Sequence, residues 1–263
     1  MIAIADIHGA ANLLLALRTH LATLPAHRRV YLGDLIDPHP RREHEHDCAG
    51  VIDQVAEDQA SGSTDVLAGN HDAFFLIARQ AGRDRVDVPW MDGIWYDQGG
   101  RETVAAWGFG FSTMGKPHEG ALARALDELM TPAQRGVFDN MKIWADHDAY
   151  LLVHAGFEPQ TPLQKQQARA SILDFPSWNS EQSHPLWMRF NPTTNAAPKG
   201  RVLVHGHTPT RSAIIGKKRI CIDTGVKYGG PLTALEIVSD QMRLHQAWPA
   251  GMDAATWKKD GMR

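Results

Sequence analysis

The sequence predicts a layered α/β fold, and two observations carry this prediction. Short apolar runs alternate with stretches whose apolar residues recur at three- and four-residue steps, as they do in amphipathic helices. The apolar runs are nearly continuous, which is typical of strands buried on both faces of a sheet. A chain of 263 residues is long enough for one large domain or two small ones.

The first third of the chain alternates predicted strands and helices. Apolar runs predict strands at Met1–Ala5, Val30–Leu32 and Asp65–Ala68. Helical spacing predicts a helix after the first strand, whose apolar face consists of Leu13, Leu14, Leu17, Leu21 and Leu24. Two further helices are expected at Cys48–Gln59 and Ala73–Ala81.

The rest of the chain contains a predicted helical insert and then more strands. Residues 82–141 carry no ligand-like cluster and are expected to be mostly helical, with helices at Glu119–Met130 and Pro132–Asn140 and with Thr131 able to cap the second. Later strands are expected at Ala149–Val153, Val202–Val204, Arg219–Ile222 and, as the last strand, Thr233–Val238. We therefore expect a single domain over 1–247 and a C-terminal tail or surface cover over 248–263.

Composition excludes several classes of function. A net charge of −3 gives no basic field for nucleic acid. Two cysteines make a disulfide framework unlikely and suit a reducing compartment. No apolar stretch is long enough to cross a bilayer, and Asp6 and His8 follow the N-terminal apolar run too soon for a signal peptide. We therefore expect a cytoplasmic protein that needs neither membrane nor nucleic acid.

Five of the apolar runs end directly in Asp, His or Asn, usually beside Gly. The polar residues at these ends are Asp6, His8, Asp34, Asn70, His154, His205 and His207. In layered α/β proteins, sites form outside the carboxyl ends of strands, but a buried charge there is costly unless a partner neutralises it. Cations that hold these residues together would resolve the conflict, and the nitrogen and oxygen donors, without thiolate, suit Mn, Fe or Zn.

Such a ligand set indicates chemistry at phosphorus. Two cations about 3.5–4 Å apart clamp an in-line displacement and can turn a bridging water into hydroxide. Asp34 is the carboxylate expected to bridge them. The leaving alkoxide then needs a proton, and His71 follows the ligand Asn70 by one residue. We expect His71 to be the general acid, with Asp37 fixing its tautomer and raising its pKa.

These residues carry a family resemblance. Five segments, in order, resemble the metallophosphoesterase signature: Asp6-x-His8, Gly33-Asp34-x-x-Asp37, Gly69-Asn70-His71-Asp72, His154-Ala155-Gly156 and Gly206-His207-Thr208. The finer resemblance is to the bacterial Ser/Thr phosphatase branch of the phosphoprotein phosphatase family, which includes diadenosine tetraphosphate hydrolases. It extends from Met1 to about residue 238, and further segments agree: Gly99–Thr103, Trp187–Arg189 and Ile222–Gly225.

The resemblance implies a fold and a set of roles. The fold would be a calcineurin-like four-layer αββα sandwich of two mixed sheets. The cofactors would be two divalent metal ions, with manganese favoured. The implied ligands are Asp6, His8, Asp34 and His207 for the first ion and Asp34, Asn70, His154 and His205 for the second. Arg189, together with Asn70 and His71, would bind the substrate phosphate.

One segment departs from the family pattern. The family reads Gly-Asp-x-x-Asp-Arg-Gly, and its arginine grips phosphate, whereas Pro38 follows Asp37 here. His39, Arg41 or Arg42 from the same loop are the candidates to replace it. Asp223 has two open interpretations, either orienting a ligand histidine or capping a turn.

Three functions remain open on the sequence. The leading hypothesis is a two-metal phosphoesterase acting on phosphomonoesters, including phosphoserine or phosphothreonine in proteins. The second is hydrolysis of a dinucleoside polyphosphate or another nucleotide phosphoanhydride. The third, from a different class, is a catalytically weak protein that binds phosphorylated partners. The Asp37–His71 pair argues against the third, and Pro38 argues for it. The partner is thus a phosphorylated protein or a small phosphoester or nucleotide, and the sequence does not fix an oligomeric state.

Overall fold

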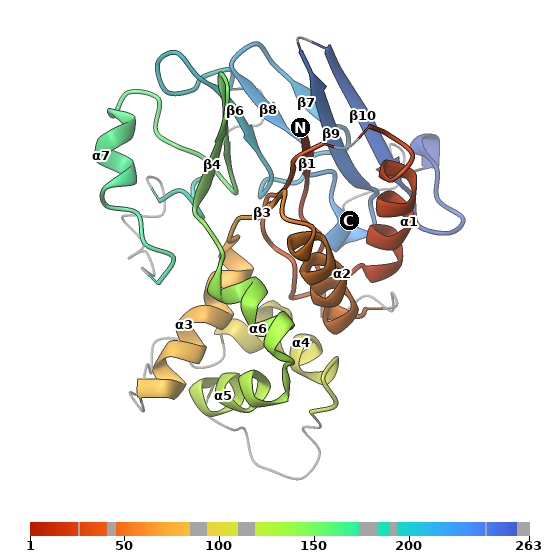
Figure 1. The fold of residues 1–263 in the computed structure, drawn as a ribbon, viewed down its shortest axis with the longest axis vertical. Helices are drawn as coiled ribbons and strands as arrows, with labels where there is room; N and C mark the ends of the chain where they lie inside the picture. Colours follow the sequence, from red (N-terminus) through yellow and green to blue (C-terminus); the bar gives the residue numbers. More distant parts are fainter. Residues whose placement is uncertain are drawn as a thin grey trace.

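The computed structural model describes residues 1–25, 27–40, 46–84, 94–109, 119–173, 184–189, 194–239 and 241–256. Within them, strands form two five-stranded sheets (Figure 1). The first sheet has the order β10-β9-β1-β2-β3 and consists of β1 (Ile2–Ile4), β2 (Arg29–Tyr31), β3 (Thr64–Val66), β9 (Leu232–Val238) and β10 (Gln241–Ala247). In this sheet β1, β2 and β3 run parallel, β9 pairs antiparallel with β1, and β10 pairs antiparallel with β9.

The second sheet has the order β4-β5-β6-β8-β7. Its strands are β4 (Trp144–His147), β5 (Tyr150–Val153), β6 (Val202–His205), β7 (Ile214–Ile215) and β8 (Arg219–Cys221). Here β5, β6 and β8 are parallel, and the two edge strands are antiparallel. Both sheets are therefore mixed.

Alternating side chains in the strands define the layers. In β1, Ala3 joins a core that includes Leu152 and Val204 of the second sheet, so the sheets pack face to face. Ile2 and Ile4 point the other way, into a core shared with α1 (Ala11–Leu21) and α2 (Cys48–Ala60). On the outer face of the second sheet, Leu151, Val153 and Leu203 pack with Leu163 of α7 (Leu163–Gln167). The expected αββα order is confirmed, with α7 as the outer layer described on that side.

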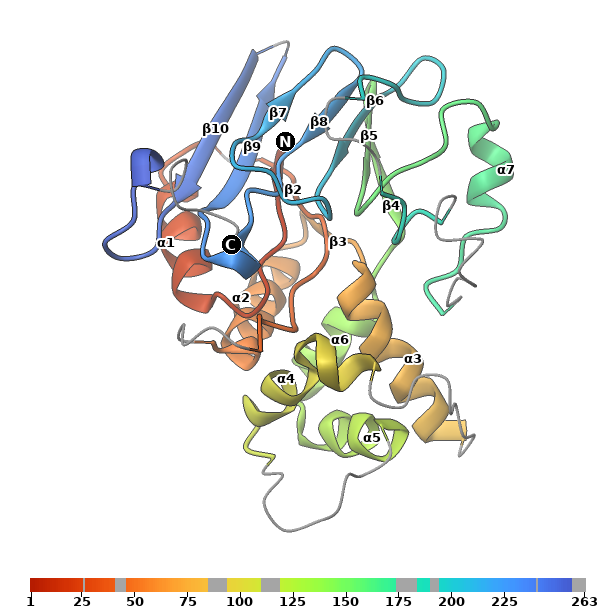
Figure 2. The same cartoon turned by 180° about the vertical axis from the view of Figure 1, so that it is seen from behind.

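The remaining helices gather at one end of the sheets, as both views show (Figures 1 and 2). They are α3 (Asn70–Asp84), the π-helical segment η2 (Tyr96–Gly100), α4 (Arg101–Ala105), α5 (Glu119–Leu129) and α6 (Pro132–Asp139). Thr131 caps α6 in a capping box with Gln134, as the sequence predicts. None of the helices in these ranges has the length and apolarity that crossing a bilayer requires.

The structure corrects several element predictions. Strand β10 follows β9, so Thr233–Val238 is not the last strand, and β4 and β7 were not expected. Most β10 side chains are exposed, so this edge strand has no apolar run to predict it. Helix α3 begins at Asn70, three residues earlier than predicted. In the expected tail or surface cover, Pro249, Ala250 and Met252 line a pocket.

Candidate metal centre

The predicted site residues lie in loops that leave the strands at one edge of the two sheets. Asp6 and His8 follow β1, Asp34 and Asp37 follow β2, and His207 follows β6. The site is completed by Asn70, the first residue of α3, and by His154, directly after β5. All of these side chains are buried. Parallel strands that end at the same edge thus bring together side chains as far apart in the sequence as Asp6 and His207.

The loops that carry these residues have a backbone conformation that non-glycine residues seldom adopt. The φ angles of His8, Asp34, Asp37 and His207 are 48°, 51°, 61° and 64°. They are four of the six non-glycine residues with positive φ in the described ranges. A left-handed backbone at a non-glycine residue costs on the order of 1–3 kcal/mol and collects at functional sites. The rest of the fold therefore stabilises a strained site.

Two glycines leave room for the carboxylates. A β-carbon at Gly206 would overlap the Asp6 carboxylate, and one at Gly69 would overlap that of Asp34. The backbone of His207 donates hydrogen bonds to Asp6 at 3.0 and 3.2 Å, and that of His71 donates to Asp34 Oδ1 at 2.9 Å. Both carboxylates are therefore fixed by backbone that approaches closely.

Asp34 lies at the centre of the site. Its Oδ2 atom is 3.5 Å from His8 Nε2 and 3.4 Å from His154 Nε2. Next to His154, Asn70 Oδ1 lies 3.0 Å from His154 Nε2 and 2.8 Å from His207 Nδ1. Two groups of potential metal ligands share Asp34: one contains His8 and His71, and the other contains His154 and His207.

The protonation of two histidines makes this arrangement a cation site. His8 Nδ1 faces the carbonyls of Ile36 and Asp37 at 3.1 and 3.0 Å, and His154 Nδ1 faces that of Leu32 at 2.9 Å. Carbonyls only accept, so each Nδ1 carries the proton. Burial lowers the pKa of His8 well below its usual value and that of His154 to about 4, so both rings are neutral. Their Nε2 lone pairs therefore face the Asp34 carboxylate, a repulsive arrangement that a cation converts into coordination.

In the part of the chain that the structure describes, no lysine or arginine forms an ion pair with Asp6 or Asp34. Burial, with Asp223 and Asp34 nearby, raises the pKa of Asp6 well above its usual value, and burial raises that of Asp34 to about 7. His207 Nε2 is buried and has no hydrogen-bond partner among the described residues. Buried carboxylate oxygens and an imidazole nitrogen without a donor fit divalent metal ions.

His205, which the sequence predicts as a ligand, is not a member of either group. Its Nδ1 faces Gly206 O at 2.8 Å, and its Nε2 accepts a hydrogen bond of 2.8 Å from Arg219 Nε. Both ring nitrogens are therefore already engaged within the chain. The side chain of His207, expected with Asp6 and His8, belongs to the group with Asp34 and His154, while its backbone bonds Asp6.

His71 and Asp37 lie together as expected. His71 Nδ1 is 3.1 Å from Asp37 Oδ2, and the other carboxylate oxygen accepts a 2.6 Å bond from Thr103 Oγ1. Trp95 Nε1 donates to both oxygens at 3.1 Å. The pKa of His71 differs from the expectation, because burial, followed by the charge of Lys227, lowers it well below its usual value. The neutral ring therefore carries its proton on Nδ1, facing Asp37, and leaves Nε2 as an acceptor that faces Lys227.

Two further residues, Lys227 and Asp72, belong to the site, and neither was predicted from the sequence. Lys227 Nζ lies 2.9 Å from His71 Nε2. The Asp72 carboxylate accepts backbone N–H groups of Asp34 at 2.7 Å, of Leu35 at 3.1 Å and of Gly69 at 2.8 Å, and so joins two ligand loops. In the sequence, Lys227 is a charged residue in a glycine-rich turn, and Asp72 is an acid in the first turn of a helix. Neither pattern is specific for a functional site.

Among the described side chains predicted to bind phosphate, Arg189 and His39 are not members of the metal-ligand groups. Arg189 is exposed, and its charge acts on Asp34 and His154 from a distance. His39 lines the pocket beside Tyr228, while Arg41 and Arg42 lie outside the described residues. Asp223 accepts a 2.9 Å hydrogen bond from Gly225 N, which is the turn-capping alternative.

Comparisons with known proteins agree with this geometry. The sequence model described as calcineurin-like phosphoesterase matches residues 1–238. A solved structure provisionally described as a diadenosine tetraphosphatase superposes with a TM-score of 0.53 at 16% identity, covering 94% of this chain and 93% of that one. A cold-active protein-tyrosine phosphatase of a psychrophilic Shewanella species gives 0.50 at 17% identity, with 94% and 79% covered. These likenesses show the fold. No curated protein matches the chain.

Proposed function

The chain belongs to the calcineurin-like phosphoesterase family and is a metal-dependent hydrolase, and within that family we propose that it hydrolyses phosphomonoesters, phosphoserine and phosphothreonine among them. One observation carries the proposal most: the Asp34 carboxylate faces the neutral imidazoles of His8 and His154 at 3.5 and 3.4 Å. A cation between these groups converts that repulsive arrangement into coordination.

The proposed ligand sets start from the two clusters, assign His71 to proton transfer and add Asp6 and Asn70. Asp6, His8 and Asp34 would hold one divalent cation, and Asp34, Asn70, His154 and His207 the other, with manganese favoured. When bound, such a pair supplies an activated water and neutralises charge that builds on phosphoryl oxygens. His205 is left out because Arg219 occupies its Nε2.

We assign the proton needed by the leaving group to His71. The Asp37 carboxylate holds its Nδ1–H. In the substrate complex the anionic phosphoryl group favours the imidazolium form of the ring, whose Nε2–H then passes its proton to the leaving oxygen. Trp95 and Thr103 fix that carboxylate in turn, so the ring cannot turn away. Proton donation is needed for an alkoxide and hardly at all for a stable phenolate.

The test compares leaving groups. His71→Asn should lower kcat on an alkyl phosphate by about 10²–10⁴-fold and leave p-nitrophenyl phosphate within about tenfold. Elemental analysis should find the metal content unchanged. His20→Asn, on the exposed side of α1, is the matched control. Full turnover of the alkyl phosphate by a metal-loaded His71→Asn protein would refute the role.

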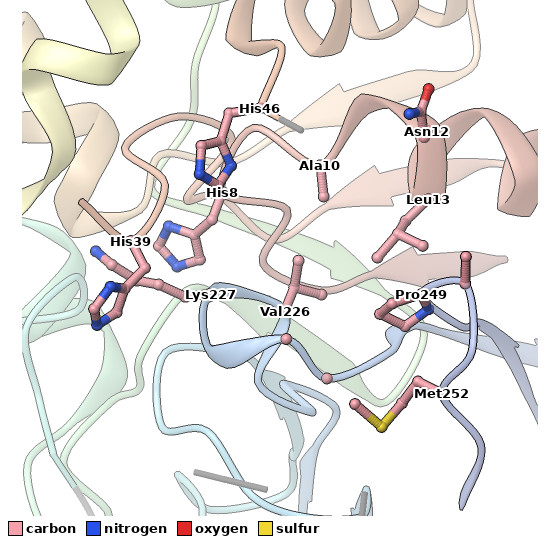
Figure 3. Close-up of a pocket in the computed structure, with 13 residues that line it drawn as sticks. His8, Ala10, Asn12, Leu13, His39, His46, Val226, Lys227, Pro249 and Met252 are labelled. Carbon is pink, nitrogen blue, oxygen red and sulfur yellow. The ribbon is translucent and has the colours of Figure 1, made fainter. Parts of the chain in front are cut away.

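A pocket beside the site favours a second candidate function, hydrolysis of a nucleotide phosphoanhydride. It has a volume of about 400 Å³, within the range of small-molecule sites. His8, His39, His46 and Lys227 gather at one end, and Leu13, Val226, Pro249 and Met252 form an apolar part (Figure 3). An apolar wall next to a phosphate site suits a compact organic group such as a nucleoside.

A substrate panel separates the two candidates. With manganese present, we expect kcat/KM for a phosphopeptide or p-nitrophenyl phosphate to exceed that for diadenosine tetraphosphate. The reverse order, lost in Met252→Glu and kept in the control Met242→Glu on β10, would establish the second function and end the first.

A further inference from the structure

Lys227 lies where the metal cluster meets the pocket. It belongs to the short 3-10 helix η3 (Val226–Tyr228), which two left-handed glycines flank, Gly225 at φ 83° and Gly229 at φ 87°. Its side chain extends past His8 toward His39 (Figure 3). Nζ lies 2.9 Å from His71 Nε2 and donates to Gln98 O at 3.2 Å. The turn therefore places an ammonium group against the proposed proton donor.

Within the described residues, no carboxylate contacts the ammonium group of Lys227. Its two hydrogen bonds within the described residues go to neutral acceptors, an imidazole nitrogen and a carbonyl. The carboxylates of Asp37, Asp34 and Asp6 attract it from further away. A lysine held at a site without a contacting carboxylate has N–H groups to offer to an anion.

We propose that Lys227 binds the substrate phosphoryl group directly and is the cation that holds its non-bridging oxygens. This inference rests on the proposed function, because it takes His71 as the donor to the leaving oxygen. An ester oxygen in hydrogen-bond reach of His71 Nε2 would take the place that Nζ now occupies, 2.9 Å from that nitrogen. The ammonium then moves onto the neighbouring phosphoryl oxygens and exchanges a neutral acceptor for a charged one.

The loop of Asp37 gives this role added weight. Pro38 follows Asp37, is buried, and has neither a backbone N–H nor a charged side chain to offer phosphate. A β-carbon at Gly99 would overlap Pro38 O, so the backbone next to Gln98 packs tightly on this proline. Lys227, bonded to Gln98 O, therefore reaches the neighbourhood of Pro38.

The experiment measures phosphate binding separately from turnover. Calorimetric titration of the manganese-loaded protein with inorganic phosphate should give a Kd that is about ten- to a hundredfold weaker in Lys227→Gln. KM for p-nitrophenyl phosphate should rise in parallel, and Lys227→Arg should restore most of both. Glutamine keeps a donor for Gln98 O, which guards against loss of the local fold. Lys217→Gln, exposed before β8, is the matched control.

Two outcomes would overturn the assignment. One is phosphate affinity unchanged in Lys227→Gln while kcat on alkyl phosphates falls, which would make Lys227 a positioning residue for His71. The other is an Arg variant as weak as the Gln variant. Because the calorimetric arm needs no turnover, a protein that hydrolyses none of the substrates can still bind phosphate through Lys227, and the two proposals fail separately.

Discussion

Two buried acids in the first half of the chain have opposite surroundings. Asp58, on α2, accepts hydrogen bonds from Arg18 at 2.7 and 3.2 Å, from Arg29 at 2.7 Å and from the Tyr31 hydroxyl at 2.6 Å. Burial alone would raise its pKa, but these partners outweigh it and lower the pKa below its usual value. Asp34 is as deeply buried, and burial raises its pKa to about 7.

The contrast separates an acid that completes the fold from one that waits for a ligand. The chain supplies Asp58 with two guanidinium groups, which tie α1, α2 and β2 together. It surrounds Asp34 with neutral imidazoles and further carboxylates, which increases the free energy of the metal-free state. Evolution retains such an unfavourable cluster where a cation from solution offsets it.

The largest expected effect is on activity at Asp34. Asp34→Asn should lower kcat/KM on p-nitrophenyl phosphate by on the order of 10³-fold or more, about 4 kcal/mol of transition-state stabilisation, because it removes the carboxylate shared by both ligand sets. In excess EDTA the same variant should unfold at equal or higher urea concentration than the wild type. A variant destabilised in EDTA would mean that Asp34 is a structural acid like Asp58.

The next effect is on stability at Asp58. Asp58→Ala should lower the free energy of unfolding by about 3 kcal/mol or more, since it strands two partly buried guanidinium groups. Urea denaturation measures this, and kcat per bound metal should stay unchanged. Glu57→Ala, which removes an exposed partner of Arg18, is the control and should change stability by less than about 1 kcal/mol.

Metal removal should produce an effect of intermediate size that depends on pH. Asp34 has a folded-state pKa of about 7, above the ordinary 3.8, so its contribution to stability is fully present below pH 3.8 and is lost as the pH rises toward 7. Up to pH 6.5 the lowered pKa of His154 acts in the opposite direction, so metal-free protein should lose stability mainly from pH 6.5 upward. Manganese at a hundred times its Kd should return about 2.7 kcal/mol at pH 7. Thermal melts with and without EDTA from pH 5 to 8 would show this, and a flat EDTA series would contradict it.

The smallest effect is expected at Tyr31. Tyr31→Phe removes one donor from Asp58 but leaves both arginines. The free energy of unfolding should therefore fall by about 1–2 kcal/mol. Chemical denaturation measures the change. A loss as large as that of Asp58→Ala would show that the hydroxyl, and not the arginines, holds the acid.

Sequence patterns predicted most of the strands and helices because buried strands must be apolar and amphipathic helices must be periodic. The patterns did not predict β10, whose side chains are mostly exposed, or β7, which has two residues. Asp34, His8 and His154 could be expected together because each follows a buried strand, and parallel strands end at a common edge.

Other parts of the site depend on neighbours that sequence spacing does not reveal. His205 and His207 are indistinguishable as residue types, but Arg219 reaches the first from the neighbouring strand β8. The contact between Lys227 and His71 joins residues 156 positions apart, through a turn without periodicity. The direction of the His71 pKa was missed for the same reason, because the charge that helps to lower it belongs to Lys227.

Gly69 and Gly206, pressed against the carboxylates of Asp34 and Asp6, constrain how this protein can diversify. Even an alanine at either position would displace an acid from the centre, so mutational routes to new specificity are closed there. The wall formed by Pro249, Ala250 and Met252 has no such constraint and lies beyond residue 238, where the family match ends. Libraries that randomise this wall should yield altered substrate preference with an intact hydrolytic centre, whereas libraries at the two glycines should yield inactive clones.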